Sequence, residues 1–175
     1  MAVMSDFWVF GYGSLIWNPG FEVIKKERAQ LYGLHRSFCV YSWVHRGTKE
    51  NPGLVLGLDR GGSCQGMAML ALGDKRDEII NYLRARELVT DVYLECWRKI
   101  RLQNGEQVSA LVYRADQDHQ QYASGLSLDT QTEIVRQSQG KSGHNVDYVK
   151  STVSAMKENG IRDHSLEYID AKLSS

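Results

Sequence analysis

The segment Val9-Phe10-Gly11-Tyr12-Gly13-Ser14-Leu15-Ile16-Trp17 joins an apolar run, which we expect to be a β-strand, to a loop bracketed by Gly11 and Gly13. Glycine has no Cβ, so the backbone at these positions can approach a ligand closely or adopt positive φ. The amides of Tyr12 to Leu15 and the Ser14 hydroxyl can then converge on an anion. Two glycines at the end of a strand are also typical of a plain tight turn, and the spacing alone leaves both interpretations open.

Neither glycine-containing motif of the chain predicts a nucleotide site. A dinucleotide-binding fingerprint requires a third glycine where Ile16 stands and a helix that opens there, whereas Ile16-Trp17-Asn18-Pro19-Gly20 predicts a turn. Gly140-Lys141-Ser142-Gly143 resembles the end of a phosphate-binding loop. However, Val135 occupies the position of its first glycine, and we expect no strand before it.

Composition predicts one domain over residues 1–175, without an electrostatic partner. Lys plus Arg and Asp plus Glu each number 21, so there is no net field to attract nucleic acid or an anionic membrane. The three cysteines, Cys39, Cys64 and Cys96, are far apart and form no CxxC pair, which favours single buried thiols over disulfides or zinc. We see no leader peptide and no apolar run long enough to span a membrane, and therefore expect a cytoplasmic protein.

The first two thirds of the chain are rich in strand-forming residues. Apolar and β-branched runs between glycine clusters predict strands at 7–12, 30–42, 54–58, 65–72, 93–102 and 108–113. Asn104-Gly105 predicts a hairpin between the last two. We interpret the glycine-dense segment 57–66 as a hairpin turn, or alternatively as a second backbone wall of a pocket. These strands are enough for a small closed or strongly curled sheet.

Helical periodicity appears after the fourth of these strands and throughout the last third of the chain. We predict four helices. The first is capped by Asp74 and has Ile79, Ile80 and Leu83 on one face, and the second begins at Asp129 and includes Ile134 and Val135. The third has a stripe of Val146, Val149, Val153 and Met156 and ends at Gly160, and the fourth is capped by Asp163 and includes Leu166, Ile169 and Leu173. The fold class is therefore α+β.

Glu87 is a charged residue on the apolar face of the first predicted helix. At about 100° per residue its side chain projects between Ile79 and Ile80, in line with Leu83, so that a carboxylate ends an apolar face. One interpretation is that the helix frays and Glu87 reaches water or pairs with a neighbouring arginine, Arg84 or Arg86. The other is that apolar walls raise its pKa and make it a general base near neutral pH.

The histidines provide no comparable signal. The five of them, His35, His45, His119, His144 and His164, have no metal-ligand spacing, and we interpret each as a structural or surface residue. We therefore predict no metal site.

The strings FGYGSLIWNPGF (10–21), LHRSFCVYS (34–42), RGT..NPGLVLGLDRGGSCQG (46–66), YLRARE (82–87) and GKSGHNVDY (140–148) resemble the ChaC-type, glutathione-specific γ-glutamylcyclotransferases. The resemblance covers nearly the whole chain in order. It implies a γ-glutamylcyclotransferase-like fold, a small mixed β-barrel flanked by α-helices. It also implies a cofactor-free lyase that cleaves glutathione to 5-oxoproline and cysteinylglycine.

Carried over by position, the resemblance makes Glu87 the catalytic residue and the loop residues substrate binders, namely Gly11, Tyr12, Gly13, Ser14, Leu15 and Ile16. Tyr12 and Tyr93 are candidate donors to the oxyanion. We expect glutathione as the partner and neither nucleic acid nor membrane; the oligomeric state stays open, and a monomer fits. The loop 140–145 either touches substrate or only turns the chain, and we favour the turn.

The sequence departs from this family at the expected pocket rim. Leu88-Val89-Thr90-Asp91 lacks a glycine pair common in relatives, and Leu94-Glu95-Cys96-Trp97 replaces a commoner proline-arginine run. Two alternatives remain beside a glutathione enzyme. One is a cyclotransferase for other γ-glutamyl amino acids or γ-glutamylamines, and the other is a non-catalytic binding module of the same fold.

Overall fold

The computed structural model describes residues 4–88 and 91–175. In chain order the elements are β1 (Phe7–Gly11), α1 (Ser14–Trp17), β2 (Lys25–Ser42), β3 (Gly53–Ala71), the 3₁₀ turn η1 (Gly73–Lys75), α2 (Arg76–Glu87), β4 (Tyr93–Leu102), β5 (Gln107–Ala115), α3 (Leu128–Gln137), β6 (Gln139–Gly140), β7 (Gly143–His144), α4 (Asn145–Glu158) and α5 (His164–Leu173).

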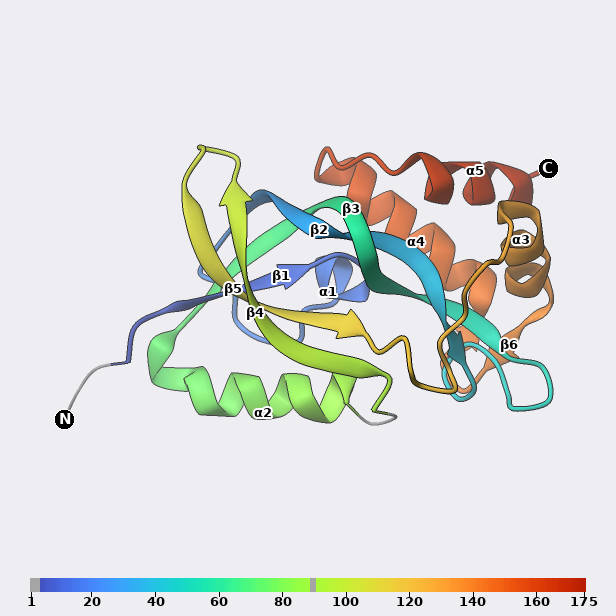
Figure 1. Cartoon of the computed structure of the whole chain (residues 1–175), viewed down its shortest axis with the longest axis horizontal. Helices are drawn as coiled ribbons and strands as arrows, with labels where there is room; N and C mark the ends of the chain where they lie inside the picture. The colour runs from blue at the N-terminus through green and yellow to red at the C-terminus, as the bar shows by residue number, and fades with distance from the viewer. Residues whose placement is uncertain (1–3, 89–90) are drawn as a thin grey trace.

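Five strands close a barrel in the order β1-β3-β2-β4-β5 (Figure 1). The neighbouring pairs in this order are antiparallel. The barrel closes through a short parallel pairing, in which Trp8 and Val9 of β1 lie opposite Ala110 and Leu111 of β5. The expected hairpin at Asn104-Gly105 joins β4 to β5. The predicted closed sheet is therefore confirmed.

The glycine-dense segment 57–66 is not a turn, and this prediction was wrong. It lies inside β3, which pairs with β2 along nearly its whole length, and the chain reverses instead at residues 43–52. Gly61 and Gly62 have φ of 98° and 65°, beside a register shift where Gly33 of β2 has φ of 91°. The positive φ angles of these glycines therefore allow an irregularity in the pairing of two long strands and do not reverse the chain.

Strand β1 separates two apolar layers because successive side chains point to opposite faces. Phe7 and Val9 pack against Ile79 and Leu83 of α2. Phe10 points into the main core. Each large apolar side chain buried in this way contributes roughly 1.5–3 kcal/mol.

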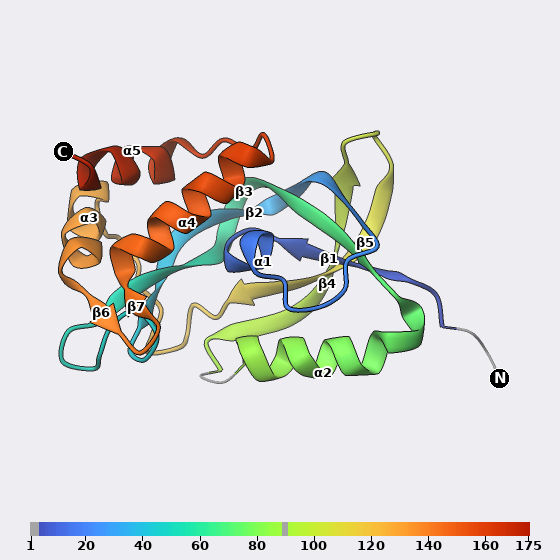
Figure 2. The ribbon, with the colours of Figure 1, turned by 180° about the vertical axis from the view of Figure 1, so that it is seen from behind.

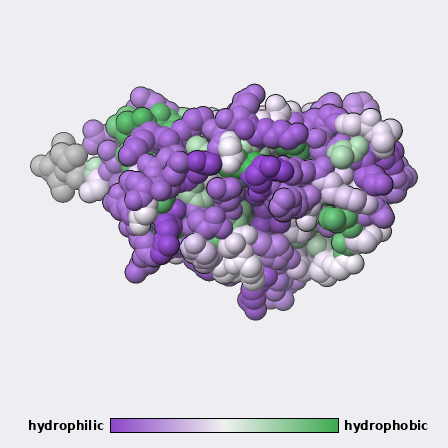
Figure 3. All heavy atoms as spheres, turned by 90° about the horizontal axis from the view of Figure 1, so that it is seen from above, coloured by the Kyte–Doolittle hydropathy of each residue, from purple (hydrophilic) through white to green (hydrophobic). Residues whose placement is uncertain are grey.

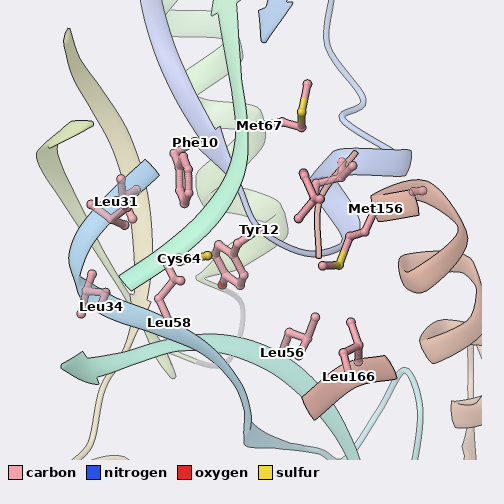
Figure 4. Packing of buried hydrophobic residues seen from close by; sticks show 14 of the residues in the cluster. Phe10, Tyr12, Leu31, Leu34, Leu56, Leu58, Cys64, Met67, Met156 and Leu166 are labelled. Atoms are coloured by element: carbon pink, nitrogen blue, oxygen red, sulfur yellow. The ribbon is translucent and has the colours of Figure 1, made fainter. Parts of the chain in front are cut away.

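The main core continues from the barrel into the C-terminal helices. Figures 1 and 2 show α3, α4 and α5 gathered at one end of the molecule, away from α2. In Figure 4, Tyr12 lies between Leu31 on the barrel side and Met156 on the helical side. The stripe predicted on α4 is confirmed, since its four members belong to this core or pack against it.

Two helix starts differ from the sequence prediction, and two cap predictions are confirmed. Asp74 lies in η1 and caps nothing, because α2 begins at Arg76 without a side-chain cap. The N-cap of α3 is Ser127, whose side chain accepts from the Thr130 amide, so Asp129 is already in the first turn. Asp163 does cap α5, and Gly160, with φ of 71°, follows the end of α4.

No helix among the described residues is long and apolar enough to cross a membrane. The face seen in Figure 3 is largely hydrophilic, with small separate apolar patches. The three cysteines are free; Cys39 and Cys64 are buried, whereas Cys96 is half-buried.

Candidate active site

A pocket of about 430 Å³ opens between the loop after β1, the C-terminal end of α2, the start of β4, the β2–β3 connection and α4. This volume is in the range of small-molecule sites. The residues with polar side chains that line it include Tyr12, Ser14, His45, Arg46, Arg86, Glu87, Tyr93, Tyr113, Ser142 and Tyr148. Glu87 and the glycine-bracketed loop, far apart in sequence, thus face one cavity.

Glu87 is the last residue of α2, and its side chain is only 14% exposed. The i, i+4 spacing from Ile79 and Leu83, both buried, turns its carboxyl group toward the apolar side of the helix. Burial raises the pKa of Glu87 above its ordinary value, and the nearby Arg86 guanidinium opposes this shift. A carboxyl group in this state exchanges its proton closer to neutral pH than an ordinary glutamate does, which suits an acid or base.

The structure agrees in part with each of the two sequence interpretations of Glu87, the pairing with an arginine and the burial in an apolar wall. Arg86 Nε lies 3.5 Å from Glu87 Oε1, so the carboxylate does have an arginine neighbour. Arg84 instead pairs with Glu95. The helix continues to Glu87, however, and the side chain stays in the pocket wall rather than in water.

The loop after β1 brings four of its six predicted binding residues to the pocket, namely Tyr12, Gly13, Ser14 and Leu15. Gly11 and Ile16 are buried and are not part of the lining. A Cβ at Gly11 would lie 2.7 Å from Met69 Cε, so that glycine permits close packing, while Ile16 belongs to the main core.

The predicted turn at residues 16–20 is wrong for its first two residues. Ser14–Trp17 forms the single helical turn α1, in which the Ile16 amide donates to the Gly13 carbonyl at 2.9 Å. The Ser14 and Leu15 amides precede this first helical bond, so α1 itself supplies no acceptor for them. Neither Gly11 nor Gly13 has positive φ. The space left by the missing side chain, not an unusual φ, is what Gly13 contributes.

Arg86 fixes the loop against α2. Its Nη2 donates to Ser14 Oγ at 3.0 Å, and its Nη1 donates to the Asn18 and Pro19 carbonyls. From the sequence, Arg86 is predicted only as a possible partner for Glu87. Its hydrogen bonds tie the predicted binding loop directly to the helix that carries the candidate base.

Three tyrosines, Tyr12, Tyr93 and Tyr148, lie near Glu87, and two of them, Tyr12 and Tyr93, are predicted from the sequence as donors. Burial raises the pKa of Tyr12 and Tyr93 well above the ordinary value, and raises the pKa of Tyr148 to about 12, so all three keep their protons at neutral pH. The Tyr93 hydroxyl donates to the Leu56 carbonyl, whereas the Tyr148 hydroxyl accepts from the Leu56 amide. The Tyr148 hydroxyl can therefore still donate a hydrogen bond to a ligand, whereas the Tyr93 hydroxyl already donates its proton to the Leu56 carbonyl.

The opposite wall joins the β2–β3 connection to the loop 140–145. His45 Nδ1 lies 2.8 Å from Ser142 Oγ, and both residues line the pocket. A Cβ at Gly140 would lie 2.4 Å from the Val44 carbonyl oxygen, so this glycine allows the two loops to touch. Ser142 thus places the loop 140–145 in the pocket wall, and our preference for a plain turn over a substrate contact stays a prediction. His45 is exposed, as expected for a surface histidine, and it also lines the pocket.

Asn145 attaches this wall to the barrel. Its side chain is fully buried, accepts from the Leu54 amide and donates to the Leu54 carbonyl, both at 2.8 Å. Of the divergent rim segment 88–91, Val89 and Thr90 lie outside the described residues. Among the described residues, no three His, Cys, Asp or Glu side chains form a group that could hold a metal ion.

Comparison with known proteins identifies the family. The model of a family described as ChaC-like protein matches residues 7–175. The chain belongs to the ChaC-like family.

Named relatives of this ChaC-like chain agree with that result. It is 33% identical over 159 residues to a glutathione-specific γ-glutamylcyclotransferase of Escherichia coli (strain K12), covering 91% of this chain and 69% of that protein. It is also 33% identical over 163 residues to glutathione-specific γ-glutamylcyclotransferase 1 of Danio rerio, covering 90% and 82%. The family resemblance found in the sequence is thereby confirmed.

A solved structure supports the fold of this ChaC-like chain. A crystal structure of a γ-glutamyl cyclotransferase specific to glutathione from yeast superimposes with a TM-score of 0.88 at 22% identity, covering 97% of this chain and 96% of that one. At this identity the likeness establishes the fold alone. The expected γ-glutamylcyclotransferase-like fold, a barrel flanked by helices, is confirmed.

Proposed function

We propose that this ChaC-like chain is a glutathione-specific γ-glutamylcyclotransferase, with Glu87 as its general acid and base. The observation that carries the proposal is the buried Glu87 carboxyl group in one pocket with the Tyr12–Leu15 loop. The names of the relatives supply the substrate class. The proposal treats residues 1–175 as a single domain that works in the cytoplasm, and a monomer is sufficient for it.

The reaction is an internal displacement. The α-amino group of the γ-glutamyl residue attacks its own γ-carbonyl carbon, and the bond to the cysteine nitrogen breaks, which yields 5-oxoproline and cysteinylglycine. As an ammonium group the amine has no lone pair, so a base must first remove a proton. Glu87 accepts that proton, which contributes roughly a hundred- to ten-thousandfold in rate.

The departing cysteinylglycine amine needs a proton when the tetrahedral intermediate collapses. Glu87 has just received one and returns it to this nitrogen, so the carboxyl group ends the cycle as it began. The ring nitrogen loses its second extra proton as the lactam forms, and the released amine takes up one proton to become an ammonium group. The raised pKa of Glu87 suits both halves of this cycle, because the group then changes its protonation state closer to neutral pH.

The pocket supplies positioning and charge stabilisation. The amides at the start of α1 and the Ser14 hydroxyl are placed to hold the substrate's α-carboxylate, which folds the γ-glutamyl chain for ring closure. The Tyr12 and Tyr148 hydroxyls are the donors we assign to the oxyanion. The Tyr12 hydroxyl makes no hydrogen bond to another described residue, so it, too, has a proton to give.

The proposal is tested by incubating the purified protein with glutathione and quantifying 5-oxoproline and cysteinylglycine. Release of both in equal amounts supports it. A panel of γ-glutamyl amino acids and γ-glutamylamines separates the related cyclotransferases, which would prefer those compounds. Tight binding of glutathione without any product would instead indicate a non-catalytic binding module.

A further inference from the structure

Arg46 is a cationic group of the pocket that the proposed chemistry does not use. It lies in the β2–β3 connection, is half-buried and lines the cavity. Its Nη1 donates to the His144 carbonyl at 3.0 Å, and its guanidinium carbon lies 5.7 Å from the centre of the Tyr148 ring. These contacts hold the guanidinium in place but use few of its five N–H donors.

The described residues offer Arg46 no carboxylate partner. Arg86, the other pocket arginine, differs in this respect. It is next to Glu87 and donates to Ser14, Pro19 and Tyr82. Arg86 therefore holds the loop after β1 in place. Arg46, in contrast, carries a permanent positive charge that no carboxylate of the described residues neutralises.

Tyr148 relates Arg46 to the reacting end of the pocket. Its hydroxyl faces Gly13 of the binding loop, since a Cβ placed there would lie 3.5 Å from it. The face of its ring carries Arg46. Tyr148 thus contacts the loop after β1 through its hydroxyl and Arg46 through its ring. In Figures 1 and 2 the connection that carries it lies beside β6, at the end of the molecule away from the body of α2.

The charges of the pocket match those of glutathione when the two ends are assigned separately. Glutathione has one ammonium group and two carboxylates. Glu87 and the loop after β1 account for the ammonium and the first carboxylate. The second carboxylate ends the cysteinylglycine half, two residues or roughly 7 Å of extended chain beyond the scissile bond.

We infer that Arg46 binds the C-terminal carboxylate of the cysteinylglycine half and so makes the site selective for γ-glutamyl peptides over shorter or uncharged γ-glutamyl compounds. The inference rests on the proposed function and assigns a specificity residue within it. A guanidinium fork held by Tyr148 and the His144 carbonyl is suited to a carboxylate, because both present paired, planar groups.

The test compares glutathione with its glycine-amide analogue, which keeps the reacting half and loses only the distal charge. For the wild-type protein we expect kcat/KM to fall roughly tenfold to a hundredfold with the amide, mainly through KM, since the lost contact is a charge-assisted hydrogen bond remote from the reacting atoms. In Arg46→Met, glutathione loses a similar factor and the two substrates become nearly equal.

Two further variants separate the guanidinium contact from general effects. Arg46→Lys keeps a charge without the fork, so discrimination is reduced but not lost, and this variant decides the question if the methionine variant does not fold. Lys141→Met removes an exposed cation beside Ser142 that does not line the pocket, and it keeps the full wild-type discrimination.

The outcomes distinguish the inference from the proposed function. Equal kcat/KM for both substrates in the wild-type protein, or undiminished discrimination in Arg46→Met, overturns the role of Arg46 while the cyclotransferase stands. Turnover of neither substrate by the wild-type protein overturns the proposed function, and the specificity role falls with it.

Discussion

The carboxyl group of Glu87 occupies a position that favours its protonated form in the folded protein. Because the folded-state pKa lies above the unfolded value, the stability contribution is present below the unfolded pKa and is lost as pH rises through the folded pKa. Glu87→Gln should therefore be more stable than the wild type near neutral pH, and this difference should shrink toward pH 4. Urea unfolding near pH 4 and near pH 7 checks this. A variant that is less stable at both values would contradict it.

The same residue predicts an acid limb in the activity. Only ionised Glu87 accepts the substrate proton, so kcat/KM falls as pH drops through the raised pKa of Glu87. We expect the midpoint of this limb above the ordinary glutamate value near 4.3. A pH profile of 5-oxoproline formation measures this midpoint. If the residual activity of Glu87→Asp shows the same acid limb with the same midpoint, another group titrates there.

Two substitutions at Gly13, to alanine and to valine, test whether the loop after β1 binds substrate. A Cβ there would meet Tyr148 and Leu56 at 3.5–3.6 Å, which is ordinary contact, so Gly13→Ala fits. Gly13→Val adds two methyl groups next to the Tyr148 hydroxyl and should lower kcat/KM for glutathione at least tenfold more than alanine does. Steady-state kinetics of both variants measure this, with Ser14→Ala as a milder comparison that removes one hydroxyl. Equal activity of Gly13→Val and the wild type would place substrate elsewhere.

At the level of elements, Asn145 connects the start of α4 to β3. Asn145→Ala removes both hydrogen bonds to Leu54 and leaves that buried amide and carbonyl unpaired, which costs on the order of 2–4 kcal/mol. Chemical denaturation measures the loss. Asn145→Asp is the sharper comparison, because it keeps the acceptor for the Leu54 amide and loses the donor. Unfolding midpoints equal to the wild type in both variants would contradict this role.

Local patterns predicted most elements and half of the pocket. Glu87 was singled out because the 79, 83, 87 spacing is a property of one helix, and the loop after β1 because Gly11 and Gly13 flank a single residue. The contact between the two loops of the opposite wall was not predicted, since His45 and Ser142 are 97 residues apart in the sequence and meet only in the folded chain. The long strand β3 was missed because glycines that allow an irregularity are the same residues that allow a turn.

At the scale of the whole molecule, buried Arg36 joins the loop after β1 to the barrel and to the start of the last helix. Its guanidinium donates to the carbonyls of Tyr12 and Gln65, both at 2.6 Å, and to Asp163 Oδ2 at 3.1 Å. Arg36→Met leaves the Asp163 carboxylate without its partner and should cost about 3–5 kcal/mol of unfolding free energy.

Arg162 supplies the control for Arg36. Its side chain is 69% exposed and pairs with Glu167, so Arg162→Met should leave the urea midpoint nearly unchanged. Similar losses in Arg36→Met and Arg162→Met would show that Arg36 does not hold the molecule together as the structure indicates.

The account depends most on Glu87 as the group that moves the proton, and one measurement addresses it directly. Glu87→Gln is nearly isosteric but cannot accept the ammonium proton. With glutathione as substrate we predict a large fall in kcat for 5-oxoproline release, which corresponds to a loss of on the order of 3–5 kcal/mol of transition-state stabilisation. Calorimetry should show that glutathione binding is largely preserved. Turnover near the wild-type rate in Glu87→Gln would contradict the assignment of Glu87 as the base.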